Sequence, residues 1–123
     1  MSQKYKVGLV QINNSFNNQN YLPLSLGYLY SYAAEKSKNF EDYDFTKPIY
    51  KRLKIAEALN QLRAVDLACF STYVWNINLS KEIAKRLKET NPNITTVFGG
   101  CHIPDTKEKG LYDFMYQNPF IDI

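Results

Sequence analysis

The chain has 123 residues, 45% of them hydrophobic and 22% charged, which matches one folded domain with an ordinary core. Fifteen Lys and Arg residues against twelve Asp and Glu give a formal net charge of +3, which is too small to indicate a nucleic-acid partner. No apolar run is long enough to span a membrane, and two cysteines are too few for a disulfide scaffold. We therefore expect a cytoplasmic protein with reduced thiols that binds neither nucleic acid nor membrane.

The first half of the chain predicts two strands and two helices. Residues 6–12 form an apolar run that predicts a buried strand, and the Asn-rich segment 13–20 predicts a loop. Residues 21–37 predict a helix of about 15 residues from their apolar spacing. A weak alternation predicts a short strand near 43–45, and residues 51–63 predict an amphipathic helix. The apolar stripe of the first helix is Leu22, Leu26, Leu29 and Ala33, and that of the second is Ile55, Leu59 and Leu62.

The second half continues the alternation of strand and helix. Residues 65–70 predict a third strand, 78–90 the clearest helix of the chain, and 94–98 a fourth strand. A helix is predicted over 105–116, and the apolar end 120–123 predicts a fifth strand. The stripe of the clearest helix is Leu79, Ile83 and Leu87, and the pair that resembles a capping box before the last helix is Asp105 and Glu108.

Alternating strands and helices predict a parallel sheet with helices on both faces. Right-handed crossovers make this a doubly wound α/β fold of the flavodoxin-like or Rossmann-like type. We predict an open, parallel, five-stranded sheet with the order 2-1-3-4-5 in three α/β/α layers. A closing helix is missing after Ile123, so we expect residues 1–123 to be a single domain, truncated before a further domain.

Ligands of open α/β sheets bind at the carboxyl ends of the strands. That edge should comprise residues 11–16, 71–76 and 99–104. The first of these loops contains no glycine, which excludes a dinucleotide fingerprint, and the chain has no P-loop motif. A flavodoxin-type phosphate loop remains an alternative because the first loop is polar, although it lacks the Ser/Thr-Gly character of such loops.

Hydrolytic and metal chemistry have little support in the sequence. The single histidine, His102, follows Cys101, and neighbouring residues in an extended loop point to opposite sides. The chain lacks a nucleophile elbow, and two distant cysteines with one histidine do not make a metal site. We predict no catalytic residue and no metal ligand.

Two loops of small residues remain at the predicted edge. Ser71, Thr72 and Tyr73 follow the third strand, and Gly99 and Gly100 follow the fourth. Glycine lets a ligand or another backbone approach closely, so two such loops side by side would form a slot for a long, flat group. The alternative is that the diglycine is only a turn between strand and helix.

The order and spacing of these loops resemble the cobalamin-binding domain at the amino terminus of B12-dependent radical-SAM enzymes. That family has Ser-x-Leu after its third strand and a Gly-Gly further on, which correspond here to residues 71–73 and 99–100, with Tyr73 in place of Leu. The family's Gly-Gly-Pro-His corresponds to residues 99–102, which read Gly-Gly-Cys-His here and are followed by Pro104. Residues 22–29 are similar to its Pro-x-x-Leu-Gly-x-x-x-Leu helix, and 119–123 resemble the stretch before its Gly-Glu-Gly-Glu loop.

The loop after the first strand departs from classical cobalamin domains. Those domains carry Asp-x-His-x-x-Gly there, and the histidine ligates cobalt, whereas residues 13–18 of this chain contain no histidine. The resemblance to the radical-SAM subfamily implies base-off cobalamin without a protein histidine ligand. His102 lies in another loop, where we interpret it as a hydrogen-bonding residue. The cofactor-binding residues that the resemblance implies are Asn13, Asn14, Ser15, Ser71, Thr72, Tyr73, Trp75, Gly99, Gly100 and His102.

The resemblance also implies a role. Ser71 and Thr72 would hydrogen-bond the nucleotide tail of cobalamin, the diglycine would leave room for it, and Tyr73 or Trp75 would pack on an apolar ring. A downstream radical-SAM domain with S-adenosylmethionine and a 4Fe-4S cluster would perform the chemistry, which is methyl transfer to an unreactive centre in most of the family. This chain alone would dock the cofactor without catalysis. The alternatives are a non-catalytic α/β interaction or regulatory module that has lost the cofactor, and a flavin carrier.

Overall fold

The computed structural model describes residues 3–105 and 109–123 and confirms the predicted α/β architecture. One sheet contains four parallel strands in the order β4-β1-β5-β6, which is the order predicted for the first four strands. The elements in chain order are β1 (Tyr5–Val10), β2 (Ser15–Phe16), β3 (Gln19–Asn20), α1 (Leu24–Lys36), a short 3₁₀ helix (Phe40–Asp42), β4 (Tyr43–Phe45), α2 (Ile55–Leu62), β5 (Leu67–Ser71), α3 (Ile77–Thr90), β6 (Thr95–Gly99) and α4 (Lys109–Gln117).

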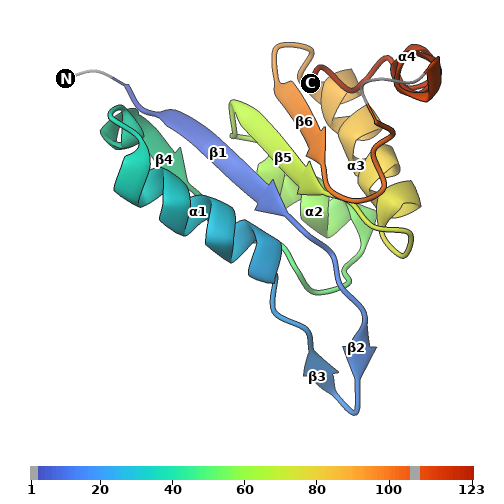
Figure 1. The fold of residues 1–123 in the computed structure, drawn as a ribbon, viewed down its shortest axis with the longest axis horizontal. Coiled ribbons are helices and arrows are strands. Elements are labelled where there is room, and N and C mark those ends of the chain that lie inside the picture. Colours follow the sequence, from blue (N-terminus) through green and yellow to red (C-terminus); the bar gives the residue numbers. More distant parts are fainter. Residues whose placement is uncertain (1–2, 106–108) are drawn as a thin grey trace.

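The helices divide between the two faces of the sheet (Figure 1). Helices α2 and α3 cover one face, and α1 alone lies on the other. Side chains alternate along each strand, so Ala68 and Phe70 of β5 belong to the core under α2 and α3, whereas Leu67 and Cys69 face α1. The core under α2 and α3 is the larger one. The core on the α1 side has only three buried members, Val7, Leu9 and Leu26.

The predicted loop over 13–20 contains a small hairpin, which corrects the sequence prediction. Strands β2 and β3 pair through Ser15–Asn20 and Phe16–Gln19. Asn17 and Asn18 between them have φ angles of 49° and 61°, the left-handed conformation that a tight hairpin turn requires and that Asn tolerates. The hairpin extends away from the body of the domain (Figure 1).

The predicted fifth strand is not formed among the described residues, so the sheet has four strands instead of five. The terminal segment nevertheless lies beside β6: Ile123 N donates to Thr96 O (3.2 Å), and Phe98 N donates to Ile123 O (2.8 Å). These two bonds have the pattern of a parallel pair. The Asp122 carboxylate also accepts from Thr96 N (2.8 Å) and from the Lys88 ammonium, which fastens the segment to β6 and α3. The terminal segment is therefore held beside β6 by these side-chain bonds and two backbone bonds, and not by the regular hydrogen bonding of a fifth strand.

The buried stripe predicted for the first helix is only partly confirmed. Leu26 is the only buried residue of α1, and Leu22 and Leu29 of the predicted stripe are 73% and 66% exposed. Leu26 packs against Val7 and Leu9 of β1, and the Tyr30 ring packs against Phe45 of β4, whereas Leu22 and Leu29 stay exposed. No helix in the described part of the chain is long and apolar enough to cross a membrane.

The other helices agree with the sequence apart from their ends. Helix α2 begins at Ile55 rather than at 51, because the Glu57 carboxylate accepts from Lys54 N (3.1 Å) and caps the helix there. Helix α3 begins one residue before the predicted start and ends at the predicted Thr90. The capping pair predicted for the last helix includes Glu108, which lies outside the described residues.

Candidate ligand site at the carboxyl edge of the sheet

A large groove lies on the α1 side of the sheet. Because α1 leaves β5 and β6 uncovered, side chains of those two strands on this face, such as Cys69 and Val97, belong to its floor. Leu26 and Leu29 of α1 line its wall, and Gly99 lies at its carboxyl end. Its volume of about 850 Å³ is in the range of small-molecule and cofactor sites.

The two glycines at the end of β6 differ in what they permit. A Cβ built on Gly99 would meet no atom within 4 Å, so this position opens onto free space at the end of the groove. Gly100 has a φ of +108°, and a Cβ there would lie 2.6 Å from Thr72 O. The backbone conformation therefore requires glycine at position 100. At position 99 a side chain would fit, so the absence of one leaves free space at the end of the groove.

Ser71 and Thr72 have separate positions at the end of β5. Thr72 is fully buried, and its backbone N and its Oγ1 both donate to Gly99 O, at 2.7 and 2.8 Å. Thr72 thus clamps the ends of β5 and β6 together instead of facing the groove. Ser71 lines the groove. His102 donates its backbone N–H to Thr72 O (3.4 Å) and is exposed.

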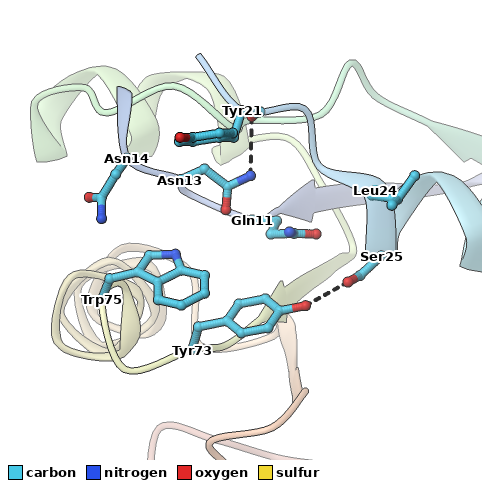
Figure 2. Close-up of a pocket in the computed structure, with 8 residues that line it drawn as sticks. All are labelled: Gln11, Asn13, Asn14, Tyr21, Leu24, Ser25, Tyr73 and Trp75. Carbon is cyan, nitrogen blue, oxygen red and sulfur yellow. Dashed lines mark hydrogen bonds between the residues drawn. The ribbon is translucent and has the colours of Figure 1, made fainter. Parts of the chain in front are cut away.

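A second, smaller pocket of about 460 Å³ opens beside the groove, at the carboxyl end of β1 (Figure 2). The rings of Tyr73 and Trp75 stack in parallel there, 4.6 Å between centroids and 2° between planes. The Tyr73 and Ser25 hydroxyls share a hydrogen bond of 2.6 Å. Both residues line the groove as well as the pocket, so this hydroxyl pair stands between the two cavities.

Buried asparagines and one arginine hold the loops of this edge in place. The Asn76 Nδ2 donates to Ile12 O (3.0 Å) and Ser71 O (3.1 Å), which joins the ends of β1 and β5. The Asn76 Oδ1 accepts from Tyr73 N (2.8 Å) and fixes the start of the aromatic loop. Arg52 donates to Asn14 Oδ1 (3.3 Å) and to Trp75 O (3.0 Å).

Asn13 has a similar role on the other side of the pocket. Its Nδ2 donates to Tyr21 O (3.1 Å) and to Leu22 O (3.3 Å), and the residue is 6% exposed. These bonds place the segment before α1 so that the Tyr21 ring faces the Tyr73–Trp75 stack across the pocket (Figure 2). The Asn13 donor is therefore already used by the protein.

The structure brings together most of the sequence-predicted site residues, but in two cavities. Ser71, Tyr73, Gly99 and Gly100 line the groove, and Asn13, Asn14, Tyr73 and Trp75 line the smaller pocket. Ser15, Thr72 and His102 line neither cavity. Sequence reasoning did not single out the pocket residues Gln11, Tyr21, Leu24 and Ser25, or the clamp Asn76. Among these residues, the sequence signal that could have indicated the pocket was at Gln11, a polar residue directly after the apolar run of a buried strand.

Both cavities are electrically neutral, because none of their lining residues is charged. Burial raises the pKa of the Cys69 thiol on the groove floor, which keeps it in the neutral form. Within the described residues, no group of three or more His, Cys, Asp or Glu side chains is placed to hold a metal ion. The cavities are therefore suited to a neutral, largely apolar ligand with some hydrogen-bonding groups.

Fold and site together define an α/β domain with a parallel, Rossmann-like or flavodoxin-like sheet and a ligand-sized cavity at its carboxyl edge. No family model matches the chain. The chain is 32% identical over 107 residues to the cobalamin-dependent radical SAM methyltransferase TokK of Streptomyces tokunonensis. It is 31% identical over 103 residues to 2-(S-pantetheinyl)-carbapenam-3-carboxylate methyltransferase of Streptantibioticus cattleyicolor.

These matches cover 87% and 84% of this chain but only 15% and 14% of the two relatives. The chain is therefore homologous to a segment of two methyltransferases, one of which is a cobalamin-dependent radical SAM enzyme, and this homology confirms the resemblance found in the sequence.

Proposed function

We propose that this chain is a corrinoid-docking domain that holds cobalamin at the carboxyl edge of its sheet. The nucleotide tail of the cofactor enters the groove between α1 and the strands β5 and β6. The observation that carries the proposal is the free space above Gly99, at the end of a neutral groove of about 850 Å³. The cobalamin dependence of one homologue, which covers 87% of this chain, supports the same ligand.

The residues of the groove fit such a tail. Its floor and wall are apolar at Cys69, Val97 and Leu26, which suits the flat aromatic base of the nucleotide. Ser71 provides a hydroxyl in the lining of the groove, where it can hydrogen-bond polar groups of the tail. Thr72 serves indirectly, because its two bonds to Gly99 O hold the ends of β5 and β6 together at the carboxyl end of the groove.

We further propose that cobalamin is bound base-off and without a histidine from this chain. The loop after β1 offers Asn13 and Asn14, whose amide groups already bond to the protein, and His102 lies in an exposed turn of another loop. When bound, the cofactor supplies a carrier for a methyl group. The residues of this chain bind its tail and exclude water from the groove.

The proposal extends to the protein of which residues 1–123 would form one domain. Its relatives are about seven times longer than the aligned segment, since the segment covers 14–15% of them. We propose an adjoining radical-SAM domain that holds S-adenosylmethionine and a 4Fe-4S cluster and completes methyl transfer to an unreactive centre. In this arrangement the present chain docks the cofactor and has no catalytic residue of its own.

The decisive variant is Gly99→Val. Its side chain projects into the open end of the groove, so the fold is retained while the space for the tail is filled. We expect hydroxocobalamin to bind more than about tenfold more weakly than to the unaltered protein. Binding is measured by quenching of Trp75, the single tryptophan of the chain. Gly27→Val is the matched control, because Gly27 also has open space around it but lines neither cavity of the site.

Chemical labelling of Cys69 gives a second measurement of the same proposal. In a Cys101→Ser background, iodoacetamide labels Cys69 on the groove floor, slowly because the thiol is neutral, and bound hydroxocobalamin should slow the reaction several-fold further. Unchanged labelling at saturating corrinoid, or unchanged affinity of Gly99→Val, would place the tail elsewhere. A protein that binds no corrinoid would favour the interaction module that has lost its cofactor.

A further inference from the structure

Gln11 carries a buried amide that the fold leaves without a complete set of partners. It follows β1 directly, its backbone N donates to Ile49 O (2.9 Å), and the residue is 5% exposed. Its Oε1 is buried and has no hydrogen-bond partner among the described residues. Buried polar atoms are nearly always paired, and leaving one unpaired costs about 1–3 kcal/mol. An orphaned acceptor beside a cavity therefore points to a ligand group that completes it.

This amide lies in the smaller pocket and not in the groove that we propose for the nucleotide tail. Figure 2 shows it between the Tyr21 ring and the Tyr73 ring, with its end directed toward Ser25. The Ser25–Tyr73 hydroxyl pair stands next to it, and only one of the two protons is used in their mutual bond. The pocket thus offers an amide and a free hydroxyl proton between aromatic walls.

The chemistry of the pocket selects a narrow class of group. A glutamine amide presents a donor and an acceptor side by side, and its complement is another primary carboxamide, which pairs with it through two hydrogen bonds. This complementarity holds whichever way the Gln11 amide is turned. An ionic group is disfavoured, because no charged side chain lines the pocket to compensate it.

We propose that Gln11, with the Ser25–Tyr73 hydroxyl pair, forms a subsite for a neutral primary carboxamide of the ligand. The inference rests on the proposed function, because the corrin ring of cobalamin carries such carboxamides around its edge. The groove takes the nucleotide tail, and this pocket takes a carboxamide of the ring. The site is thereby divided into two parts that recognise different portions of one ligand.

The test uses Gln11→Met, which keeps the length of the side chain and removes the amide. Its corrinoid affinity should fall about tenfold, whereas its melting temperature should stay equal or rise because an unpaired buried amide is lost. Gln61→Met, an exposed position on α2, is the matched control and should change neither quantity. If Gln11→Met lowered the melting temperature as well as the corrinoid affinity, Gln11 would have only a structural role and the proposal would be overturned.

Two corrinoids separate this proposal from the one on the nucleotide tail. Cobinamide keeps the corrin ring and its carboxamides but lacks the nucleotide. Gln11→Met should weaken cobalamin and cobinamide by the same factor, whereas Gly99→Val should weaken cobalamin alone. Unaltered affinity of Gln11→Met for both corrinoids would overturn the carboxamide subsite and leave the groove proposal standing.

A probe without any corrin ring gives an independent result. Nicotinamide is a flat primary carboxamide smaller than the pocket, and its titration into ¹⁵N-labelled protein should shift the Gln11 side-chain amide signals. The shift should disappear in a Tyr73→Ala variant, which removes one wall and one hydroxyl of the pocket. Absence of a shift in the unaltered protein would overturn the subsite even if cobalamin binds.

Discussion

The two faces of the sheet differ sharply although the same strands build both. On the face under α2 and α3, side chains such as Phe70, Leu62 and Leu87 are buried in one continuous core. On the α1 face, the alternate side chains of β5 and β6 form the floor of an open groove. The comparison indicates that one face supplies the stability of the domain and the other keeps space for a ligand.

The sharpest test of this difference compares two leucines in helices on opposite faces. Leu87 of α3 is 1% exposed, whereas Leu29 of α1 is 66% exposed. Leu87→Ala should lower the free energy of unfolding by about 2–5 kcal/mol, because it leaves a cavity in the packed core. Leu29→Ala should change it by less than about 0.5 kcal/mol. Urea denaturation measures both, and equal losses would contradict the division between the faces.

A smaller difference in stability is expected between the two neighbouring glycines at the end of β6. Gly100→Ala should destabilise the protein by roughly 1–3 kcal/mol, because its φ is +108° and the new Cβ would clash with Thr72 O. Gly99→Ala should leave the melting temperature unchanged, because its Cβ meets open space. Thermal denaturation of both variants measures this difference. An equal fall in melting temperature in Gly99→Ala and Gly100→Ala would mean that the end of the groove is packed and not open.

The smallest expected effect concerns the segment that lies beside β6. Partial burial acts to raise the pKa of Asp122, but the hydrogen bond and charge of Lys88 and the bonds from Thr96 outweigh it and lower the pKa below 3.8. A lowered pKa in the folded state adds stability that is present above the unfolded pKa and is lost as the pH falls through the folded one.

Asp122→Asn should therefore cost less than about 1 kcal/mol at neutral pH, since the ion pair is partly exposed and screened. It should also flatten the fall of stability below the unfolded pKa of about 3.8. Urea denaturation at neutral and acidic pH measures both effects. An identical acid profile for the variant and the unaltered protein would show that this carboxylate does not couple to folding.

The sequence predicted the features that depend on local pattern. Apolar runs placed β1, β5 and β6 to within two residues at each end, and the strand–helix alternation predicted their parallel order. Helical spacing identified the buried face of α3, with Ile83 and Leu87 in the core. Ser71 and the diglycine were predicted at the correct edge, because parallel strands end on the same side of a sheet.

Other features depend on which surfaces meet, and only the tertiary structure decided them. The stripe predicted for α1 is buried only at Leu26, because periodicity shows that a helix has an apolar side but does not show how much of that side finds a partner. Gly99 and Gly100 are neighbours of the same residue type, yet only the approach of Thr72 distinguishes the residue required by the backbone from the one that leaves free space. The orphaned oxygen of Gln11 arises in the same way, since hydrogen-bond partners are set by three-dimensional packing and not by position along the chain.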